Sequence, residues 1–526
     1  MIREGKRGKR SSSLLLAVVL LLAALLSACG GGSNSISGGS QQGNAPNASS
    51  NSQQGSPSAD EPPTEIRIMV HFFGATPPAS DNAVKLKIEE ATNTKLDIQW
   101  VSANNYKEKF NVTLASGDIP DLILVTDPFD PVFRRAAEQG AFWDVSPYID
   151  EYSYMKETIA PIAWDMTKIN GKNYGLPRPR PSEGEAFFIV RKDWLDNLGL
   201  SVPETAEQLY EVMKAFTTQD PDKNSKDDTI GLAGQVDGSS MSTLAEFERI
   251  FYQAYGNWKL QDGQLVHVVT LPETREALVM LAQAYAEGLI PLDFASMKLS
   301  QVKDMFKAGQ AGIIVEKSGA LQEYYDALKK IDPNFDMKNL LPLTSVNGYN
   351  PKGPGFSGVI AIPKSVSEDK LKKILAALDR WSQDDLFLMH SQGIEGIHHT
   401  VQDGKIVIDT EKVTADGLGE FNQILYVADP YASTVKRTFP EDVQELYASI
   451  QDERAKTSVA NVGTGLYSET GATFMQEFNK TVQDLKTKII LGVEPIEAWD
   501  AFVASLDSNE SFKKTTAEMN EAYKNR

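Results

Sequence analysis

A regular alternation of strand-like and helix-like patterns runs from residue 65 to residue 125 and narrows the choice of folds. Residues 65–70 and 95–100 alternate apolar and polar side chains, as strands with one buried face do. Residues 81–92 have apolar side chains at helical spacing, and residues 106–116 form a second predicted helix. Residues 121–125 are a short apolar run, typical of a buried strand in a parallel sheet. This order predicts an α/β fold built from strand–helix–strand units.

The chain has 526 residues, which is more than one hydrophobic core usually accommodates, so two lobes are expected. A favoured turn pair at Asp262 and Gly263 predicts a hairpin over 259–265. Further patterns predict a strand at 313–315 and helical segments at 274–288, 301–307, 363–381, 440–457, 474–491 and 496–526.

The N-terminus has the organisation of a signal peptide. Five basic residues precede an apolar stretch at 14–26, which is too short to span a bilayer comfortably. The sequence Leu26-Ser27-Ala28-Cys29 then resembles the lipobox of bacterial lipoproteins. That resemblance implies a signal peptide over 1–28 and a Cys29 that carries acyl chains such as palmitate; two chains anchor a protein stably. The alternative is an ordinary signal, or an uncleaved anchor, with a cysteine nearby by chance. Cys29 is the only cysteine, so no intramolecular disulfide is possible.

Residues 29–63 are mostly Gly, Ser, Asn, Gln and Pro, a composition that predicts a flexible tether. The formal net charge of the whole chain is −19, and loss of the basic leader would make the protein more acidic still. Such acidity argues against nucleic acid or a bare anionic membrane surface as a partner.

The sequence contains no nucleophile elbow, zinc-protease helix or phosphate-binding glycine loop. There are only five histidines, and the adjacent pair His398 and His399 would point to opposite sides of an extended segment. Carboxylate pairs of the glycosidase kind are not excluded, because the chain has 71 acidic residues. We therefore expect a protein that is not an enzyme, with a secreted polysaccharide lyase or hydrolase as the alternative.

Six short sequence motifs follow one another along the chain. They are ASGDIPD at 115–121, INGKNYGLP at 169–177, RKDWL at 191–195, GLI and DF at 288–294, GIEGIH at 393–398 and GVEPI at 492–496. Together they resemble the extracellular solute-binding proteins (family 1 type) of bacterial ABC sugar importers. The pattern is most similar to the LplA-like lipoproteins and the alginate-binding proteins. The resemblance implies a two-lobed, hinged, periplasmic-binding-protein-like fold with discontinuous lobes. We expect lobe 1 to contain residues 64–180 and about 355–428, and lobe 2 about 181–350 and 429–526.

An acidic loop follows a predicted helix that starts with a capping box at Thr205 and Gln208. Its oxygen-bearing groups have the spacing of a calcium loop, and six to eight oxygens suit that ion. In the EF-hand pattern, positions six and twelve are glycine and glutamate, whereas Ser225 and Gly231 stand here. Alginate-binding proteins carry a similar loop with an acid where this chain has Thr229. We expect one structural Ca²⁺ and no catalytic cofactor; the alternative is a solvated turn that needs no metal. The predicted ligands are Asp220, Asp222, Asn224, Lys226 through its carbonyl, and Asp228.

A sugar site needs flat aromatic side chains for the apolar faces of the rings and fixed polar groups for the hydroxyls. Loops at the carboxyl ends of strands supply such groups in open α/β sheets. Planar guanidinium groups suit vicinal hydroxyls or a uronate. On these grounds and from the family phrases, the expected ligand-binding residues are His71, Phe72, Asp127, Arg178, Arg180, Trp258, Tyr349, Trp381, Glu395, His398 and Tyr467.

The predicted function is capture of an oligosaccharide in a cleft between the lobes and its delivery to an ABC transporter. The expected partners are the glycan, the permease subunits and, through the lipid anchor, the membrane; the protein itself is expected to be a monomer. The expected location is the extracytoplasmic face of the cell membrane, on the outer surface of a Gram-positive cell. Two alternatives stay open besides the enzyme: presentation of the ligand to a sensor kinase, and a non-sugar ligand such as a peptide.

Overall fold

The strand–helix alternation at the start of the folded chain builds one half of the first β-sheet. The computed structural model describes residues 61–525 apart from 75, 403 and 437. β1 (Thr64–Phe72) pairs in parallel with β2 (Thr94–Ser102) along its whole length and with β3 (Leu122–Val125). Helices α1 (Ala83–Thr92) and α2 (Tyr106–Ser116) make the connections, so the predicted strand–helix–strand order is confirmed.

Two later strands complete this sheet, and one of them, β12, runs antiparallel to both of its neighbours. β12 (Phe356–Ala361) lies between β3 and β4 (Leu176–Pro179), giving the order β2-β1-β3-β12-β4. A Cβ atom at Gly175 would lie 2.9 Å from the Ile360 carbonyl oxygen. The glycine of the INGKNYGLP phrase therefore allows β4 to approach β12 closely.

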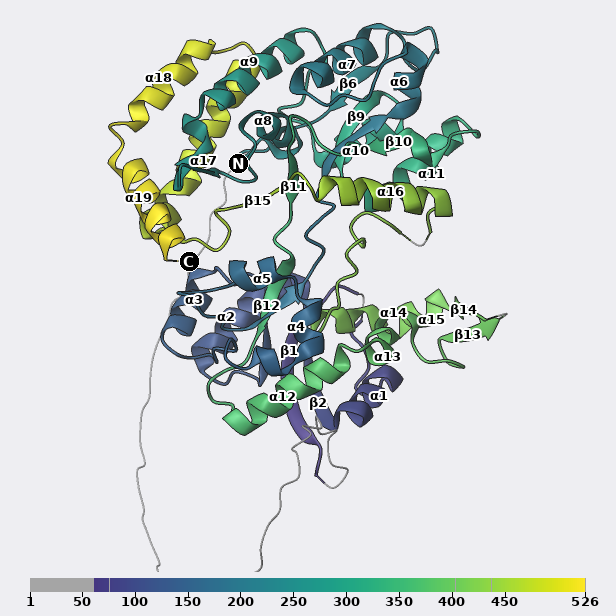
Figure 1. Cartoon of the computed structure of the whole chain (residues 1–526), viewed down its shortest axis with the longest axis vertical. Coiled ribbons are helices and arrows are strands. Elements are labelled where there is room, and N and C mark those ends of the chain that lie inside the picture. The colour runs from purple at the N-terminus through teal and green to yellow at the C-terminus, as the bar shows by residue number, and fades with distance from the viewer. Residues whose placement is uncertain (1–60, 75, 403, 437, 526) are drawn as a thin grey trace, which may run out of the picture. The chain divides into compact units, whose positions relative to one another are not determined.

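Helices α1 and α12 pack against each other beside this sheet, as Figure 1 shows. The other elements of this half are η1 (Ala103–Asn105), α3 (Pro131–Glu138), η2 (Ile149–Glu151), α4 (Ser153–Thr158), α5 (Pro161–Met166), α12 (Glu368–Trp381), α13 (Asp384–Phe387), α14 (Met389–Gln392), β13 (His399–Gln402), β14 (Lys405–Ile408), α15 (Thr410–Ala415) and η7 (Leu418–Gln423).

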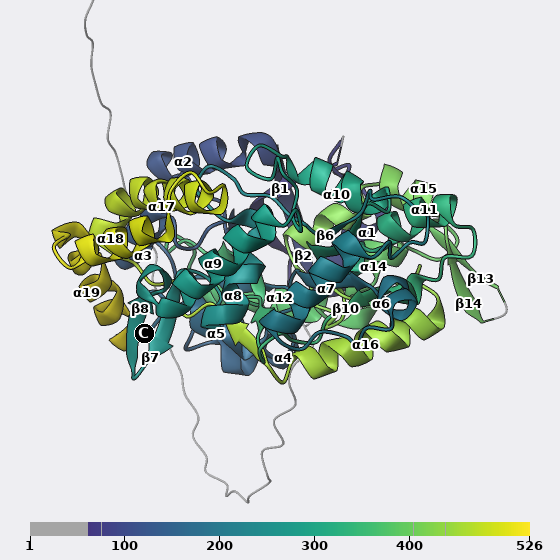
Figure 2. The same ribbon diagram turned by 90° about the horizontal axis from the view of Figure 1, so that it is seen from above.

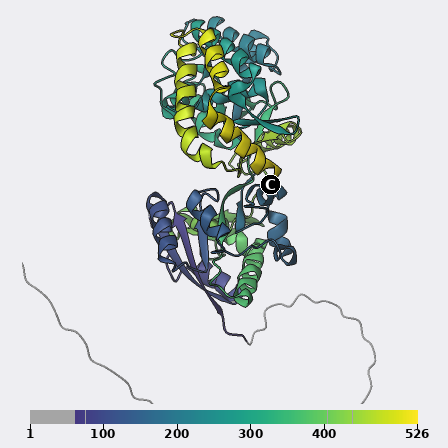
Figure 3. The same cartoon turned by 90° about the vertical axis from the view of Figure 1, so that its left-hand side faces the viewer.

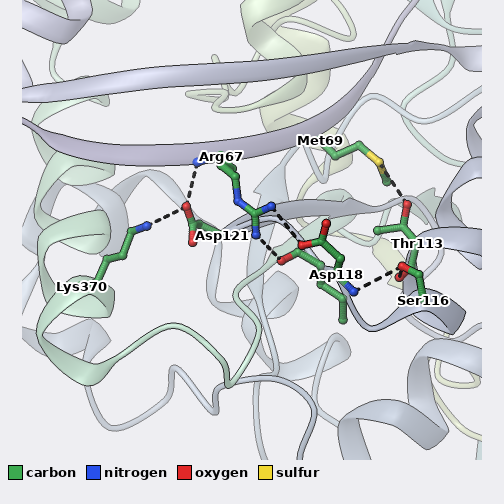
Figure 4. Close-up of polar contacts among 8 residues, drawn as sticks. Arg67, Met69, Thr113, Ser116, Asp118, Asp121 and Lys370 are labelled. Atoms are coloured by element: carbon green, nitrogen blue, oxygen red, sulfur yellow. Dashed lines mark hydrogen bonds and ion pairs between the residues drawn. The ribbon is translucent and has the colours of Figure 1, made fainter. Parts of the chain in front are cut away.

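The ASGDIPD phrase forms the turn from α2 to β3, and Figure 4 shows the side chains that hold it. Gly117 ends α2 with a φ of 74°, which favours glycine. The Arg67 guanidinium donates to Asp118 Oδ1 (3.0 Å). Asp121 Oδ2 accepts from the Arg67 main-chain N–H and from Lys370 Nζ, both at 2.8 Å. The phrase therefore joins β1, β3 and α12, and its role is structural.

The second sheet has the order β10-β5-β9-β6, in which only the β6–β9 pair is parallel. Helix α7 packs on β6 and β9, α8 contacts both α7 and α9, and α9 packs against α17 (Figure 2). The C-terminal helices α17 and α19 pack lengthwise (yellow in Figure 3). The elements of this half are β5 (Phe187–Arg191), α6 (Lys192–Leu198), α7 (Ala206–Thr218), β6 (Ile230–Ala233), η3 (Ser242–Leu244), α8 (Ala245–Tyr252), β7 (Trp258–Gln261), β8 (Gln264–His267), η4 (Val268–Thr270), α9 (Pro272–Ala286), α10 (Leu299–Lys307), β9 (Ala311–Glu316), η5 (Ser318–Ala320), α11 (Gln322–Ile331), η6 (Met337–Asn339), β10 (Leu340–Pro342), α16 (Glu441–Arg454), α17 (Glu469–Ile490), α18 (Ile496–Leu506) and α19 (Glu510–Lys524).

Each sheet has its own hydrophobic core. The core around the first sheet draws its buried residues from 66–176 and 356–425. The two clusters around the second sheet draw theirs from 187–349 and 439–512. The fold is therefore α/β with two lobes, as predicted. We propose lobe boundaries in the connections between these cores, at the positions expected from the sequence.

A short parallel pair lies where the connections meet. β11 (Asn350–Lys352) pairs with β15 (Ser458–Ala460), and neither strand belongs to the two larger sheets. The Arg180 N–H donates to the Gly355 carbonyl at 2.9 Å, which joins the segment after β4 to the segment before β12. The connections are thus hydrogen-bonded to one another.

Candidate ligand-binding site

Three polar side chains from distant parts of the chain meet at the carboxyl end of β1. Gln423 Oε1 accepts from Arg178 Nη2 at 2.8 Å and contacts His71 Nε2 at 2.9 Å. Since an amide oxygen can only accept, His71 carries its proton on Nε2. Burial lowers the pKa of His71, so its ring is neutral at pH 7. His71 is the penultimate residue of β1, Arg178 comes from β4, and Gln423 closes η7. This cluster is called the Gln423 network below.

Arg178 and Arg180 have no carboxylate partner among the described residues. The Arg178 side chain is 3% exposed, and its Nε atom is buried without a hydrogen-bond partner. Burial and the neighbouring Arg180 lower the pKa of Arg178 to about 9. Arg180 donates to the Pro179 carbonyl at 2.7 Å, and its guanidinium lies over the Tyr426 ring, 4.5 Å from the centroid.

An exposed aromatic ring stands beside the Gln423 network. The Phe73 side chain is 68% exposed, and its ring meets the His71 ring edge-on at 4.7 Å. Glu420 Oε1 accepts from the main-chain N–H groups of Phe73 (3.0 Å) and Gly74 (2.6 Å), which fixes the loop after β1. A flat exposed ring next to fixed polar groups is what recognition of a sugar ring requires.

The structure brings His71, Arg178 and Arg180 together but separates the other expected ligand residues from them. Phe72 is half-buried at the end of β1, one position before the exposed ring. Asp127 is exposed and accepts from the Phe129 N–H (2.9 Å), so it caps the turn after β3.

Two more expected residues lie elsewhere. Tyr467 lines a cavity of about 370 Å³ together with Arg134, whose guanidinium lies 5.1 Å from the centroid of the Tyr467 ring. Glu395 is exposed and bridges to His399 at the start of the β13–β14 hairpin.

Four expected ligand residues are buried in the cores, and we remove them from the proposed site. Trp258 packs with Leu265 and Met519 and is 7% exposed. Tyr349 is fully buried in the core of the second sheet. Trp381 is 2% exposed, and its Nε1 donates to a buried histidine. His398 is 1% exposed, and its Nε2 lies 2.9 Å from Asp416 Oδ2. Aromatic rings bury a large area when they pack in a core, and these four side chains are used in that way.

Two carboxylates follow β4, and both have cationic partners. Glu183 Oε1 lies 2.7 Å from Lys352 Nζ and accepts from Ser458 Oγ at 3.1 Å. Glu185 Oε1 lies 3.0 Å from Lys317 Nζ. These ion pairs and the hydrogen bond to Ser458 join the segment after β4 to β11, to β15 and to the segment after β9.

The acidic loop between α7 and β6 is folded around Asn224. The Asn224 side-chain amide donates to Asp222 Oδ2 (2.8 Å) and Asp228 Oδ1 (3.0 Å). Asp220 accepts from the main-chain N–H groups of Asn224 and Ser225, both at 3.0 Å. Ser225 has a φ of 62°, the left-handed conformation that glycine supplies at this place in an EF-hand.

The carboxylates of Asp220, Asp222 and Asp228 lie near one another in the acidic loop. Burial raises the pKa of Asp222, with further contributions from the nearby Asp220 and Asp228. Lys226 and Asp228 are exposed, and the Lys226 N–H binds Asn224 Oδ1 at 2.7 Å. In the described part of the chain, no three histidine, cysteine or acidic side chains are placed so that they could hold a metal ion. Carboxylate, amide and carbonyl oxygens are the donor types that suit a hard cation such as Ca²⁺.

The predicted lipidation site, Cys29, lies outside the described residues. Between residues 61 and 525, no helix has both the length and the apolar character needed to cross a bilayer.

Comparisons with known proteins agree with this architecture. Residues 75–377 match the family described as bacterial extracellular solute-binding protein. Lipoprotein LipO of Bacillus subtilis (strain 168) is 30% identical over 463 residues, which cover 84% of this chain and 88% of LipO. The polygalacturonan/rhamnogalacturonan-binding protein YtcQ of the same organism is 29% identical over 475 residues, covering 88% of this chain and 92% of YtcQ.

A solved structure extends the likeness to the fold. The HMO-binding, ABC-transporter-associated solute-binding protein of Bifidobacterium longum infantis superposes with a TM-score of 0.68 at 20% identity, covering 88% of this chain and 99% of that chain. The chain belongs to the bacterial extracellular solute-binding proteins. It is a binding protein and not an enzyme, as the sequence predicted.

Sequence reasoning missed the residues that complete the Gln423 network. Gln423 and Glu420 lie about 350 positions from the strand they contact, and no local pattern links them to it. The sequence analysis predicted Phe72 as a ligand-binding residue, whereas the exposed ring belongs to its neighbour Phe73. Tyr426 was the exception, because it lies close to position 428, where the second segment of lobe 1 was expected to end.

Proposed function

We propose that this chain captures an oligosaccharide between its lobes and delivers it to an ABC transporter. The observation that carries the proposal is the exposed Phe73 ring beside the Gln423 network, a stacking surface next to fixed donors. The name of YtcQ, which is similar over most of the chain, supports a carbohydrate ligand. Trp258, Tyr349 and Trp381 are buried, whereas the Phe73 side chain is 68% exposed, so we place Phe73 in the site in their stead.

The delivery step follows from the way a two-lobed protein responds to its ligand. A glycan that contacts both lobes gains contacts only when they close, so it shifts the population toward the closed form. The transporter then recognises the closed form. Presentation of the same closed form to a sensor kinase is the alternative for this step.

Two finer proposals accompany this function. The acidic loop would hold one structural Ca²⁺ through Asp220, Asp222, Asn224, the Lys226 carbonyl and Asp228. The converging carboxylates and the left-handed Ser225 support this assignment. Cys29 would carry the lipid anchor, which the lipoprotein name of LipO supports.

The test is thermal unfolding of the full-length chain in a non-ionic detergent against plant and algal oligosaccharides. A one-site ligand present at about a hundred times its dissociation constant adds about 2.7 kcal/mol to the free energy of unfolding. We expect one class of glycan to raise the midpoint and to be recovered intact. Phe73→Ala should weaken its binding several-fold, because one stacking surface is lost. Tyr154→Ala, at a ring that is 50% exposed on α4, is the matched control and should bind normally.

Other outcomes separate the alternatives. Recovery of a cleaved glycan would favour the lyase or hydrolase. A shift produced only by peptides would replace the sugar with a peptide ligand.

A further inference from the structure

Two guanidinium groups occupy neighbouring positions at the end of β4. Arg178 and Arg180 are two residues apart, so their side chains leave the strand on the same side. Arg178 makes one hydrogen bond to a neutral amide, to Gln423 Oε1, and its buried Nε atom makes none. Arg180 is half-buried and stacks on Tyr426. Both cations are therefore largely removed from water.

No negative side chain in the described part of the chain compensates this pair, although the protein has 71 acidic residues and 52 basic ones. Three other buried or half-buried arginines are ion-paired: Arg191 with Asp193, Arg249 with Glu246, and Arg380 with Asp385. The buried Arg454 has no ion pair among the described residues; burial lowers its pKa, but the nearby carboxylates of Glu246, Glu183 and Glu185 act to raise it. Burying a cation without a counter-charge costs free energy, and the proximity of two like charges adds to that cost.

The surrounding groups cannot supply the missing charge. The neutral His71 ring donates its Nε2 hydrogen to Gln423. Glu420 is the carboxylate near His71, and its Oε1 is occupied by the N–H groups of Phe73 and Gly74. The site thus contains two guanidinium groups and, among the described residues, no carboxylate that pairs with either of them.

We propose that Arg178 and Arg180 bind the carboxylate of an acidic sugar, so that the ligand is an oligosaccharide containing uronic acid. This inference rests on the proposed function and narrows its substrate class. A guanidinium presents two parallel N–H donors in a plane, which match the two oxygens of a carboxylate. The exposed Phe73 ring, which meets the His71 ring of the Gln423 network, would stack on a sugar ring of the same ligand. Neutral sugars would leave the two charges uncompensated.

The test compares probes that differ only in charge. Oligogalacturonates and oligomannuronates of about three to six units are titrated calorimetrically into the full-length chain in detergent, beside the same oligomers after reduction of every carboxyl to an alcohol. We expect at least one acidic series to bind about tenfold or more tightly than its reduced form, since charge-assisted hydrogen bonds are the stronger ones. The preference should shrink as salt is added.

Variants assign the preference to the pair. Arg180→Gln should remove most of the preference for acid, measured as the ratio of the affinities for the acidic oligomer and its reduced form. Arg178→Lys keeps a basic side chain at the buried position but loses the two parallel N–H donors of the guanidinium group. It should lower the affinity for the acidic oligomers only. Arg380→Gln removes an arginine already neutralised by Asp385 and should keep the full preference.

Equal affinity for an acidic oligomer and its reduced form would overturn the inference and leave oligosaccharide capture intact. So would an acid preference that survives in Arg180→Gln and Arg178→Lys. Binding of neutral plant glycans without any acidic probe would also overturn it. Binding of no oligosaccharide at all would defeat the proposed function together with the inference.

Discussion

His390 shows how one buried side chain can make stability depend on pH. Its ring is 2% exposed, and its Nε2 accepts a hydrogen bond from Trp381 Nε1 at 2.8 Å. The indole N–H can only donate, so the His390 proton sits on Nδ1, which faces Asn422 Oδ1 at 2.9 Å. The folded protein therefore requires a neutral ring, and burial lowers the pKa of His390 to about 4.

We predict that this histidine destabilises the protein as the pH falls from about 6.5 to about 4. Above pH 6.5 the ring is neutral in both states, whereas below it the unfolded chain binds a proton that the folded chain does not. The loss amounts to about 3 kcal/mol once the pH reaches the folded pKa. Urea unfolding of the wild type at pH 7, 5.5 and 4.5 measures it.

The His390→Gln variant isolates this contribution, because a glutamine can still accept from Trp381 but does not titrate. The buried His267, whose pKa is lowered to about 3, acts in the same direction and is unchanged in the variant. The half-exposed His399→Gln serves as the matched control. An identical pH slope in wild type and His390→Gln would contradict the prediction.

At the scale of elements, local capping decided where helices begin. The helix predicted over 363–381 starts only at Glu368, because Ser367 accepts from the Lys370 N–H and provides the N-cap. The predicted capping box at Thr205 and Gln208 is confirmed, and the apolar face of α7 is buried as expected. The segment from 496 onward forms two helices, α18 and α19, and Asn509 caps the second.

The proposed binding of Ca²⁺ by the acidic loop between α7 and β6 can be tested directly. We predict that Ca²⁺ at about a hundred times its dissociation constant raises the unfolding free energy by about 2.7 kcal/mol relative to chelator. Calorimetric titration should find one site per chain. Asp222→Asn should weaken it about tenfold or more, because Asp222 lies among the converging carboxylates.

The matched control is Asp227→Asn, which alters an exposed acid of the same loop outside the predicted ligand set. It should bind Ca²⁺ like the wild type. A midpoint that is the same with Ca²⁺ and with chelator would leave the loop as a turn closed by the Asn224 amide.

At the scale of the whole molecule, we propose that the connections between the lobes form the hinge and contribute part of the site. The Glu183 and Glu185 pairs join segments far apart in the sequence, and Arg454 Nη2 donates to the Glu185 carbonyl at 2.7 Å. Arg180 lies on the same connection as these glutamates. A ligand held by Arg180 would therefore contact the segment whose backbone angles must change when the lobes close.

The lipid anchor is also a property of the whole molecule. We predict that the wild-type chain, produced in a Gram-positive host, sediments with the membrane fraction, whereas Cys29→Ser is recovered in the soluble or secreted fraction. Two acyl chains provide stable anchoring, and the variant has none. Cys29 is the only cysteine, so the substitution disturbs no disulfide. Equal sedimentation of both proteins would contradict the anchor.

The sequence by itself determined the α/β class, the strand–helix–strand order of residues 65–125, the two lobes and the family. These properties depend on apolar periodicity and on short phrases, which are local in the chain. The ASGDIPD and INGKNYGLP phrases proved recognisable because each serves a local geometric need, a left-handed glycine in one and a close strand approach in the other.

Only the tertiary structure decided which residues form the candidate site. Trp258, Tyr349, Trp381 and His398 had the right chemistry, but the cores buried them, and burial is set by packing between distant segments. The Gln423 network joins β1, β4 and η7 across hundreds of positions. The missing counter-charge at Arg178 and Arg180 is likewise a fact of three-dimensional arrangement, since a chain rich in acids gives no sign of where a carboxylate is absent.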